Sequence, residues 1–318
     1  MSAGASSDVI PAIPVRFGLF LSQANRTWAQ TLEEFQLAED LGFDHAWLVD
    51  HLVDTDGPPE VPIHEAWTLL AAIAARTTRI RLGVLVTSNT FRHPAILAKE
   101  AVTVDHVSGG RLILGLGAGW HEPEHRRYGI DLPAPAERVG RLEEAVQMLR
   151  LLMSQERTTF EGRYYRLDDA PLSPRPVQQP RIPLLIAAHR PRMLRIAARY
   201  ADQWDTFANL AGTATDGVEA PVEDRIRALD DACREVGRDP SEIRRSTWTT
   251  GDVLVSEAAY EAFVRSHHAL GFTDFMTERP DPAHLGVLER VARERIPVLR
   301  QELSAAFQAR RPAPPPTT

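Results

Sequence analysis

The chain has little cysteine and little lysine, and each shortage limits the classes of protein to which it can belong. Cys233 is the only cysteine among 318 residues, so no disulfide can form within the chain, and a cytoplasmic setting is expected. Lys99 is the only lysine among 36 basic residues, and 43 acidic residues give a net charge of −7. A nucleic-acid-binding protein usually carries a basic excess or stripe, and neither is present, so no nucleic-acid partner is expected.

Long apolar runs are also missing. No run reaches the roughly 18 residues that a membrane-spanning helix needs, so no membrane partner is expected. Residues 1–14 lack the positive start and the apolar centre of a signal peptide. Apolar residues make up 43% of the chain and charged residues 25%, which is typical of a globular domain with a large core.

Short apolar runs typical of buried parallel strands alternate with amphipathic stretches. The expected strands are Phe17–Leu21, Ala46–Val49, Ile80–Val86, Leu112–Leu116, Leu184–Ala187, Gln203–Phe207, Ser246–Val255 and Thr273–Met276. The expected helices are Thr31–Leu41, Glu65–Arg76, Pro94–Val107, Pro135–Met153, Arg192–Ala201, Glu223–Val236, Glu257–Leu270 and Pro282–Ala306. Eight βα units without a break predict an α/β fold of the (β/α)8 TIM-barrel type. This single domain covers residues 15–307, and disordered segments are expected at 1–14 and 308–318.

Two stretches interrupt the alternation. Thr158–Leu167 and the proline-rich Pro171–Pro183 predict a hairpin and an insertion arm between the fourth and fifth units. Ala208–Pro221 predicts a mobile loop at the C-terminal mouth of the barrel. Because the chemistry of such barrels lies at the carboxyl ends of the strands, the residues there are the site candidates.

Asp50 and His51 end the second strand. A carboxylate beside an imidazole at this rim can hold or transfer a proton. The alternative is that Asp50 caps a turn and that His51 is solvated.

The fourth strand ends in the glycine-rich run 115–119. The run lacks the G-x-G-x-x-G spacing of a dinucleotide fingerprint and comes too late in the chain for one. It favours a strand end at which a flat ring or a phosphate can approach the backbone.

His121, Glu122 and His125 match the H-E-x-x-H signature of zinc peptidases. Pro123 argues against a zinc site, because a helix that begins there leaves His121 outside and the two histidines cannot share a face. No third ligand is obvious, so no metal site is predicted. A zinc hydrolase stays as an alternative.

Residues 187–190 lead from the fifth strand into a helix, whose first N–H groups can bind a phosphate. The alternative is an ordinary turn.

His267 and His268 are expected on a solvated helix face, and Cys233 is expected to be inert. Five tryptophans can wall a pocket for a flat ring or simply pack in the core: Trp28, Trp47, Trp67, Trp120 and Trp204.

Longer motifs resemble the luciferase-like monooxygenase superfamily. Residues 81–100 are similar to its third βα unit, and residues 108–129 are similar to its fourth. Further matches follow in the same order at Phe160–Tyr165, Ala198–Asp202 and Gly237–Pro240, so the resemblance covers about residues 15–299. The Gly-Ala-Gly-Trp sequence at 117–120 looks most like the branch of coenzyme F420-dependent oxidoreductases.

The resemblance implies a flavin or deazaflavin at the barrel mouth, with His51 and Asp50 as catalytic residues and His51 as proton donor or acceptor. It also implies a cis peptide between Leu85 and Val86. The cofactor-binding residues implied near the ring are Asp50, Leu85, Val86, Thr87, Asn89, Gly117, Ala118, Gly119, Trp120, Glu124, His125 and Tyr128.

The end of the fifth strand departs from the family, which usually carries Ile-Gly-Gly there to bind the cofactor phosphate. Here Ala187 and Ala188 replace the glycines, and His189 and Arg190 are expected to compensate as charged donors. We therefore predict an oxidoreductase that transfers hydride between F420 and a small organic substrate. The alternatives are an FMN-dependent monooxygenase and a barrel whose degraded cofactor site is no longer catalytic. Members of the family often dimerise, so a homodimer is also an expectation.

Overall fold

Eight parallel strands close into a barrel in the computed structural model, which describes residues 14–208 and 221–309, with side chains to residue 303. Pairing of β1 with β11 and of β3 with β5 closes the ring, which confirms the predicted TIM barrel. A two-residue strand, β4 (Thr87–Ser88), follows β3 and pairs with the end of β5. The barrel strands are β1 (Arg16–Phe20), β2 (His45–Leu48), β3 (Arg81–Val84), β5 (Leu112–Gly117), β8 (Leu184–Ala187), β9 (Gln203–Phe207), β10 (Arg244–Thr249) and β11 (Asp274–Glu278).

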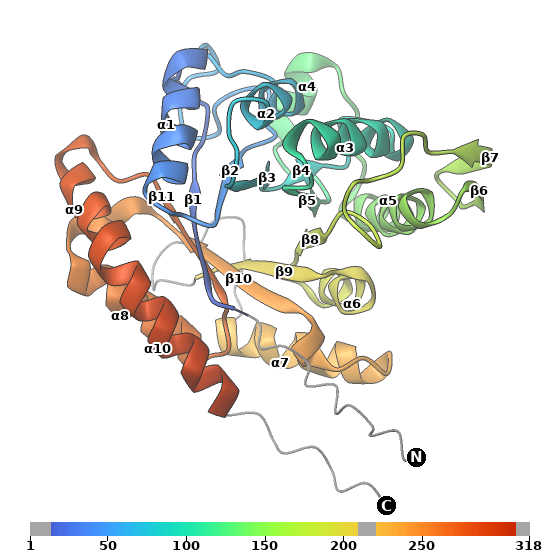
Figure 1. The fold of residues 1–318 in the computed structure, drawn as a ribbon. Helices are drawn as coiled ribbons and strands as arrows, with labels where there is room; N and C mark the ends of the chain where they lie inside the picture. Colours follow the sequence, from blue (N-terminus) through green and yellow to red (C-terminus); the bar gives the residue numbers. More distant parts are fainter. Residues whose placement is uncertain (1–13, 209–220, 310–318) are drawn as a thin grey trace, which may run out of the picture.

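The helices lie outside the barrel (Figure 1). Local signals set their ends: Thr27 and Gln30 form a capping box at the start of α1, and Gly109 ends α3 in the left-handed conformation. The helices are α1 (Trp28–Asp40), α2 (Ala66–Ala74), α3 (Pro94–Ser108), α4 (Glu122–Tyr128), α5 (Pro135–Ser154), α6 (Pro191–Tyr200), α7 (Val222–Glu235), α8 (Glu257–Ala269), α9 (Leu285–Arg290) and α10 (Ile296–Ala309). No helix in the described part of the chain is both long and apolar enough to span a membrane.

The larger core lies between the strands and the helices, and a smaller apolar cluster fills the barrel itself. This inner cluster contains Trp47, Leu85, Ile113, Leu185 and Met276. Because side chains alternate along a strand, every second residue from these positions also faces the barrel axis. The residues that line the mouth can therefore be identified from the strand register.

The insertion between the fourth and fifth units contains the predicted hairpin. It consists of β6 (Arg157–Glu161) and β7 (Arg166–Pro171), which pair antiparallel at the edge of the molecule (Figure 1). The proline-rich segment that follows has cis peptides before Pro174 and Pro180. Most of the predicted loop at 208–221 lies outside the described residues, as do most of the two predicted disordered ends.

Two element boundaries were predicted wrongly. The strand expected at Ser246–Val255 ends at Thr249, and a 3-10 turn, Gly251–Val255, follows because the chain bends over the end of β11. A Cβ atom on Gly251 would lie 2.7 Å from the Arg279 carbonyl oxygen, so this bend requires glycine. The single helix expected at Pro282–Ala306 is broken by a π turn, Val291–Arg295, just before Pro297, which has no N–H to donate.

The prediction for His267 and His268 was also wrong. Both histidines are buried, with 8% and 7% exposure. His267 packs against Phe263 and Phe272 and donates from Nδ1 to the Phe263 carbonyl oxygen at 2.8 Å. Helix α8 therefore turns this face toward the core, because the neighbouring apolar residues share its periodicity.

Candidate functional site

His51 follows the carboxyl end of β2, and a buried glutamate of α4, Glu124, holds its ring. Its Nδ1 lies 2.9 Å from Glu124 Oε1, and Glu124 Oε2 accepts from the Leu52 N–H at 2.8 Å. Burial raises the pKa of Glu124, but hydrogen bonds and the nearby His51 outweigh this and lower the pKa overall. An ionised Glu124 favours the tautomer of His51 that carries its proton on Nδ1, which leaves Nε2 as the proton acceptor.

Aromatic side chains surround His51. The exposed Trp120 lies edge-on to it at 5.6 Å between ring centroids, and His121 lies at 5.9 Å. Tyr128 is exposed, and its hydroxyl donates to the Leu52 carbonyl oxygen at 3.2 Å. The structure thus brings the predicted residues His51, Trp120, Glu124 and Tyr128 into one cluster.

Asp50 points away from that cluster and forms a buried ion pair. Its carboxylate accepts two hydrogen bonds from Arg92, at 2.6 and 3.0 Å, and a third from the Ser88 N–H at 2.8 Å. Burial lowers the pKa of Arg92, but Asp50 raises it overall. Asp50 therefore positions β4 and the turn after it, and it offers no free carboxylate for proton transfer.

The peptide between Leu85 and Val86 is cis, as the resemblance implies. The glycines of β5 face this segment from the other side. A Cβ atom on Gly115 would lie 2.2 Å from the Val84 carbonyl oxygen, and one on Gly117 would lie 2.5 Å from Val86 Cγ2. These two glycines therefore leave room for the segment around the cis peptide, a role that the sequence alone did not suggest.

Two buried oxygens at the end of β4 lack a partner among the described residues. They are Thr87 Oγ1 and Asn89 Oδ1, on side chains that are 0% and 5% exposed. The Asn89 amide nitrogen is occupied, because it donates to the Tyr165 hydroxyl at 3.2 Å. Buried polar atoms are normally paired, so both oxygens can accept or share a hydrogen bond with a bound molecule.

The H-E-x-x-H segment is arranged as its proline predicts. His121 is the N-cap of α4, while both ring nitrogens of His125 are occupied, at 2.8 Å from the His121 carbonyl oxygen and 2.7 Å from Thr90 Oγ1. Among the described residues, no group of three or more histidine, cysteine or acidic side chains is placed to hold a metal ion. Ala118 is half-buried, and Gly119 has φ +82 and leaves room for Thr90.

The end of β8 forms a second cluster. The Ala188 N–H donates to the Asp205 carbonyl oxygen at 3.1 Å, so this amide is used within the barrel. Arg190 is exposed and precedes α6, and Ala187 is half-buried. His189 stacks on Phe207 at 5.3 Å between ring centroids.

Arg225, a fully buried arginine on α7, completes this second cluster, and no sequence motif singled it out. Its Nη1 donates to Thr206 Oγ1 and lies 3.2 Å from His189 Nδ1. His189 is therefore an acceptor at Nδ1 and neutral. Burial, followed by the charge of Arg225, lowers the pKa of His189 to about 4.

Acid should therefore destabilise the protein through His189. The unfolded chain takes up this proton near pH 6.5, whereas the native protein does so only near pH 4, so stability is lost as the pH falls through this window. We expect the His189 ring signal in NMR to have its midpoint near pH 4. Between pH 7 and pH 5, the free energy of unfolding measured with urea should fall less in His189→Gln than in the wild type. A native midpoint near pH 6.5 would contradict this result.

Sequence analysis also missed one side of the mouth. Phe20, Phe207 and Trp248 form a continuous aromatic wall, with ring centroids 5.1 Å apart for Phe20 and Trp248 and 4.3 Å apart for Phe207 and Trp248. Trp248 was the one tryptophan not considered. Its place within the strand predicted at Ser246–Val255 was the available signal. Trp47, Trp67 and Trp204 are buried core residues, and Trp28 is partly exposed on α1.

The closed parallel barrel and the polar groups at its carboxyl end define the class: a TIM-barrel protein with a candidate ligand site at the mouth. Comparison with known proteins identifies the family. Residues 12–311 match the luciferase-like monooxygenase family, and the chain belongs to it. This confirms the resemblance read from the motifs.

Curated relatives are oxidoreductases by name. An F420-dependent glucose-6-phosphate dehydrogenase of Microbacterium testaceum is 35% identical over 234 residues, which are 73% of this chain and 66% of that protein. The pyrimidine monooxygenase RutA of Allorhizobium ampelinum is 31% identical over 243 residues, covering 70% of this chain and 64% of that protein. The matches thus span slightly less than two thirds of each relative's length.

Solved structures support the fold. An F420-dependent secondary alcohol dehydrogenase, in complex with an F420-acetone adduct, superposes with a TM-score of 0.75. The two share 20% identity, and the match covers 90% of this chain and 99% of the other.

Proposed function

We propose that this protein is an oxidoreductase that transfers hydride between coenzyme F420 and a small organic substrate. The observation that carries the proposal is the His51–Glu124 pair at the barrel mouth, in a chain whose curated relatives include F420-dependent dehydrogenases. The alternative, FMN with oxygen, is supported by the similarity to RutA. Substrate, cofactor and a homodimeric state all stay predictions.

The residues at the mouth fit a flat heterocycle. Thr87 Oγ1 and Asn89 Oδ1 would hold its polar edge, because both oxygens are buried and lack a partner among the described residues. Trp120 would lie on the solvent side, since it is half-exposed next to His51. When bound, a deazaflavin supplies two-electron hydride chemistry.

His51 would manage the proton of the reaction. Glu124 fixes its ring and stabilises the charge that develops when Nε2 takes up a proton. In alcohol oxidation, Nε2 would accept the hydroxyl proton as the hydride leaves the carbinol carbon. In carbonyl reduction, the same atom would return the proton to the carbonyl oxygen.

A binding titration tests the cofactor assignment. We expect the purified protein to bind F420 with a Kd of about 1 μM or lower and FMN at least about 10-fold more weakly. Thr87→Val, which removes one unpartnered oxygen, should weaken F420 binding by about 3- to 10-fold. The matched control is Thr158→Val, since Thr158 is another buried strand threonine whose hydroxyl lacks a partner among the described residues, but it lies on β6, outside the barrel.

The other outcomes of the titration are equally informative. Binding of FMN alone would replace the proposal with a flavin monooxygenase. Binding of neither cofactor would contradict both assignments and favour a barrel that has lost its cofactor site.

A further inference from the structure

Glu278 is the last residue of β11, and the strand register turns it toward the barrel mouth. Met276, two residues earlier, belongs to the inner cluster, so alternation places Glu278 on the same face. Its register partner is Phe20, the first ring of the aromatic wall. The carboxyl group is thus the acidic neighbour of a flat apolar surface at the end of the barrel where substrates bind.

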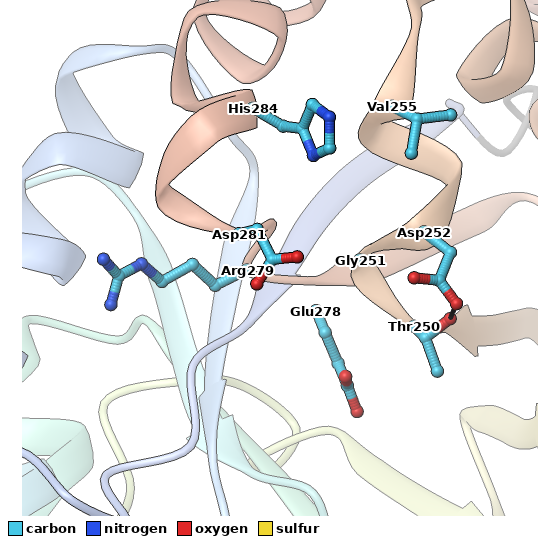
Figure 2. A pocket seen from close by; sticks show the side chains of 8 residues that line it. All are labelled: Thr250, Gly251, Asp252, Val255, Glu278, Arg279, Asp281 and His284. Atoms are coloured by element: carbon cyan, nitrogen blue, oxygen red, sulfur yellow. Dashed lines mark hydrogen bonds between the residues drawn. The ribbon is translucent and has the colours of Figure 1, made fainter.

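A cavity of about 300 Å³ opens beside Glu278 (Figure 2). Figure 2 shows the carboxyl groups of Glu278, Asp252 and Asp281 around one opening, whereas Arg279 extends away from it. The remaining lining residues are Thr250, Gly251, Val255 and His284.

No described cation neutralises Glu278. The one arginine that lines the cavity, Arg279, donates from Nη1 to Glu34 Oε1 on α1. We find no hydrogen bond or ion pair to the Glu278 carboxyl group within residues 14–208 and 221–303. Residues 209–220, outside the described structure, contain no lysine or arginine in the sequence.

The electrostatic surroundings of Glu278 have a measurable consequence. Burial, followed by the charges of Asp56 and Asp252, raises its pKa to about 7. The other charged or titratable groups that line the cavity are Arg279, Asp281 and His284. Glu278 therefore carries a proton below neutral pH and a negative charge above it. In both forms it can accept a hydrogen bond, and above neutral pH its negative charge repels an anion.

We propose that Glu278 is a specificity-determining residue that contacts the substrate, accepts a hydrogen bond from its ammonium or hydroxyl group, and excludes carboxylates and phosphates. The carbon skeleton would lie on the aromatic wall of Phe20, Phe207 and Trp248. The inference rests on the proposed function, which places the substrate at this mouth. It also separates this chain from relatives named for glucose 6-phosphate, because a sugar phosphate is an anion.

Three probes of matched shape test the proposal. They are trans-4-aminocyclohexanol, trans-1,4-cyclohexanediol and trans-4-hydroxycyclohexanecarboxylate, which are cationic, neutral and anionic. Ligand-observed NMR measures their affinities at pH 8, with and without F420, so a failure of F420 binding leaves this test intact. We expect the amine to bind at least about 10-fold more tightly than the carboxylate, because opposite charges attract in a half-buried cavity.

Variants assign the effect to one side chain. Glu278→Gln should reduce the preference for the amine to within about 3-fold, and the wild-type preference should shrink from pH 8 to pH 6 as Glu278 takes up a proton. Glu156→Gln, an exposed glutamate between α5 and β6, should keep the full preference. The proposal is overturned by equal binding of the carboxylate, by an unchanged preference in Glu278→Gln, or by no binding of any probe at about 20 mM.

Discussion

Replacing His51 by alanine is expected to lower kcat/KM for hydride transfer by about 10²- to 10⁴-fold, the range usual for a general acid or base. F420 affinity should stay within about 3-fold, because His51 is argued to handle the proton and Thr87 and Asn89 to hold the ring. Steady-state kinetics and the titration above measure the two effects separately. His64→Ala, which alters an exposed histidine after β2, is the control and should leave both values unchanged.

Glu124→Gln distinguishes positioning from proton transfer. The amide keeps the size of Glu124, but it removes the charge that stabilises a protonated His51. We therefore expect kcat to fall by less than in His51→Ala and the pH profile of kcat to change. An unchanged kcat/KM in His51→Ala would show that another group moves the proton.

Asp50→Asn is expected to lower the free energy of unfolding by about 2–4 kcal/mol, because Arg92 is left in a largely buried position without its main partner. Glu65 and Glu100, each 3.5 Å from Arg92, recover only part of this loss. F420 affinity should also fall, since Asp50 holds the Ser88 N–H and thereby the turn that carries Thr87 and Asn89. Urea unfolding and the F420 titration measure these effects.

A double-mutant cycle tests the cause of that loss. Asp50→Asn with Arg92→Met should cost less than the sum of the single variants by about 1.5–3 kcal/mol, because no unpaired charge is left. Asp40→Asn, at the exposed end of α1, should change stability by less than about 0.5 kcal/mol. A loss below about 0.5 kcal/mol in Asp50→Asn would refute a structural role for the pair.

Much of the fold could be predicted because local patterns agree with the tertiary structure. The segments 184–187 and 203–207 become β8 and β9 within the predicted bounds. The errors fall where a long-range contact overrides a local pattern. The segment Ser246–Val255 was expected to be one strand, yet it leaves the sheet after Thr249, where Gly251 meets the backbone of Arg279.

The candidate site also combines features that the sequence shows with features that only the structure shows. Adjacent residues such as Asp50 and His51 were visible in the sequence, but their partners were not. His51 pairs with Glu124, 73 residues away, and Asp50 pairs with Arg92, 42 residues away. The two neighbours therefore have different roles, which no spacing rule could separate.

The sequence by itself determined the alternation of strands and helices, the closed parallel barrel and the family, because hydrophobic periodicity and short motifs are local properties. Only the tertiary structure decided which polar groups are paired, that Gly117 accommodates Val86, and that Glu278 faces a cavity in which no described cation pairs with it. These features depend on side chains from strands far apart in the chain, and closure of the barrel is what brings them together.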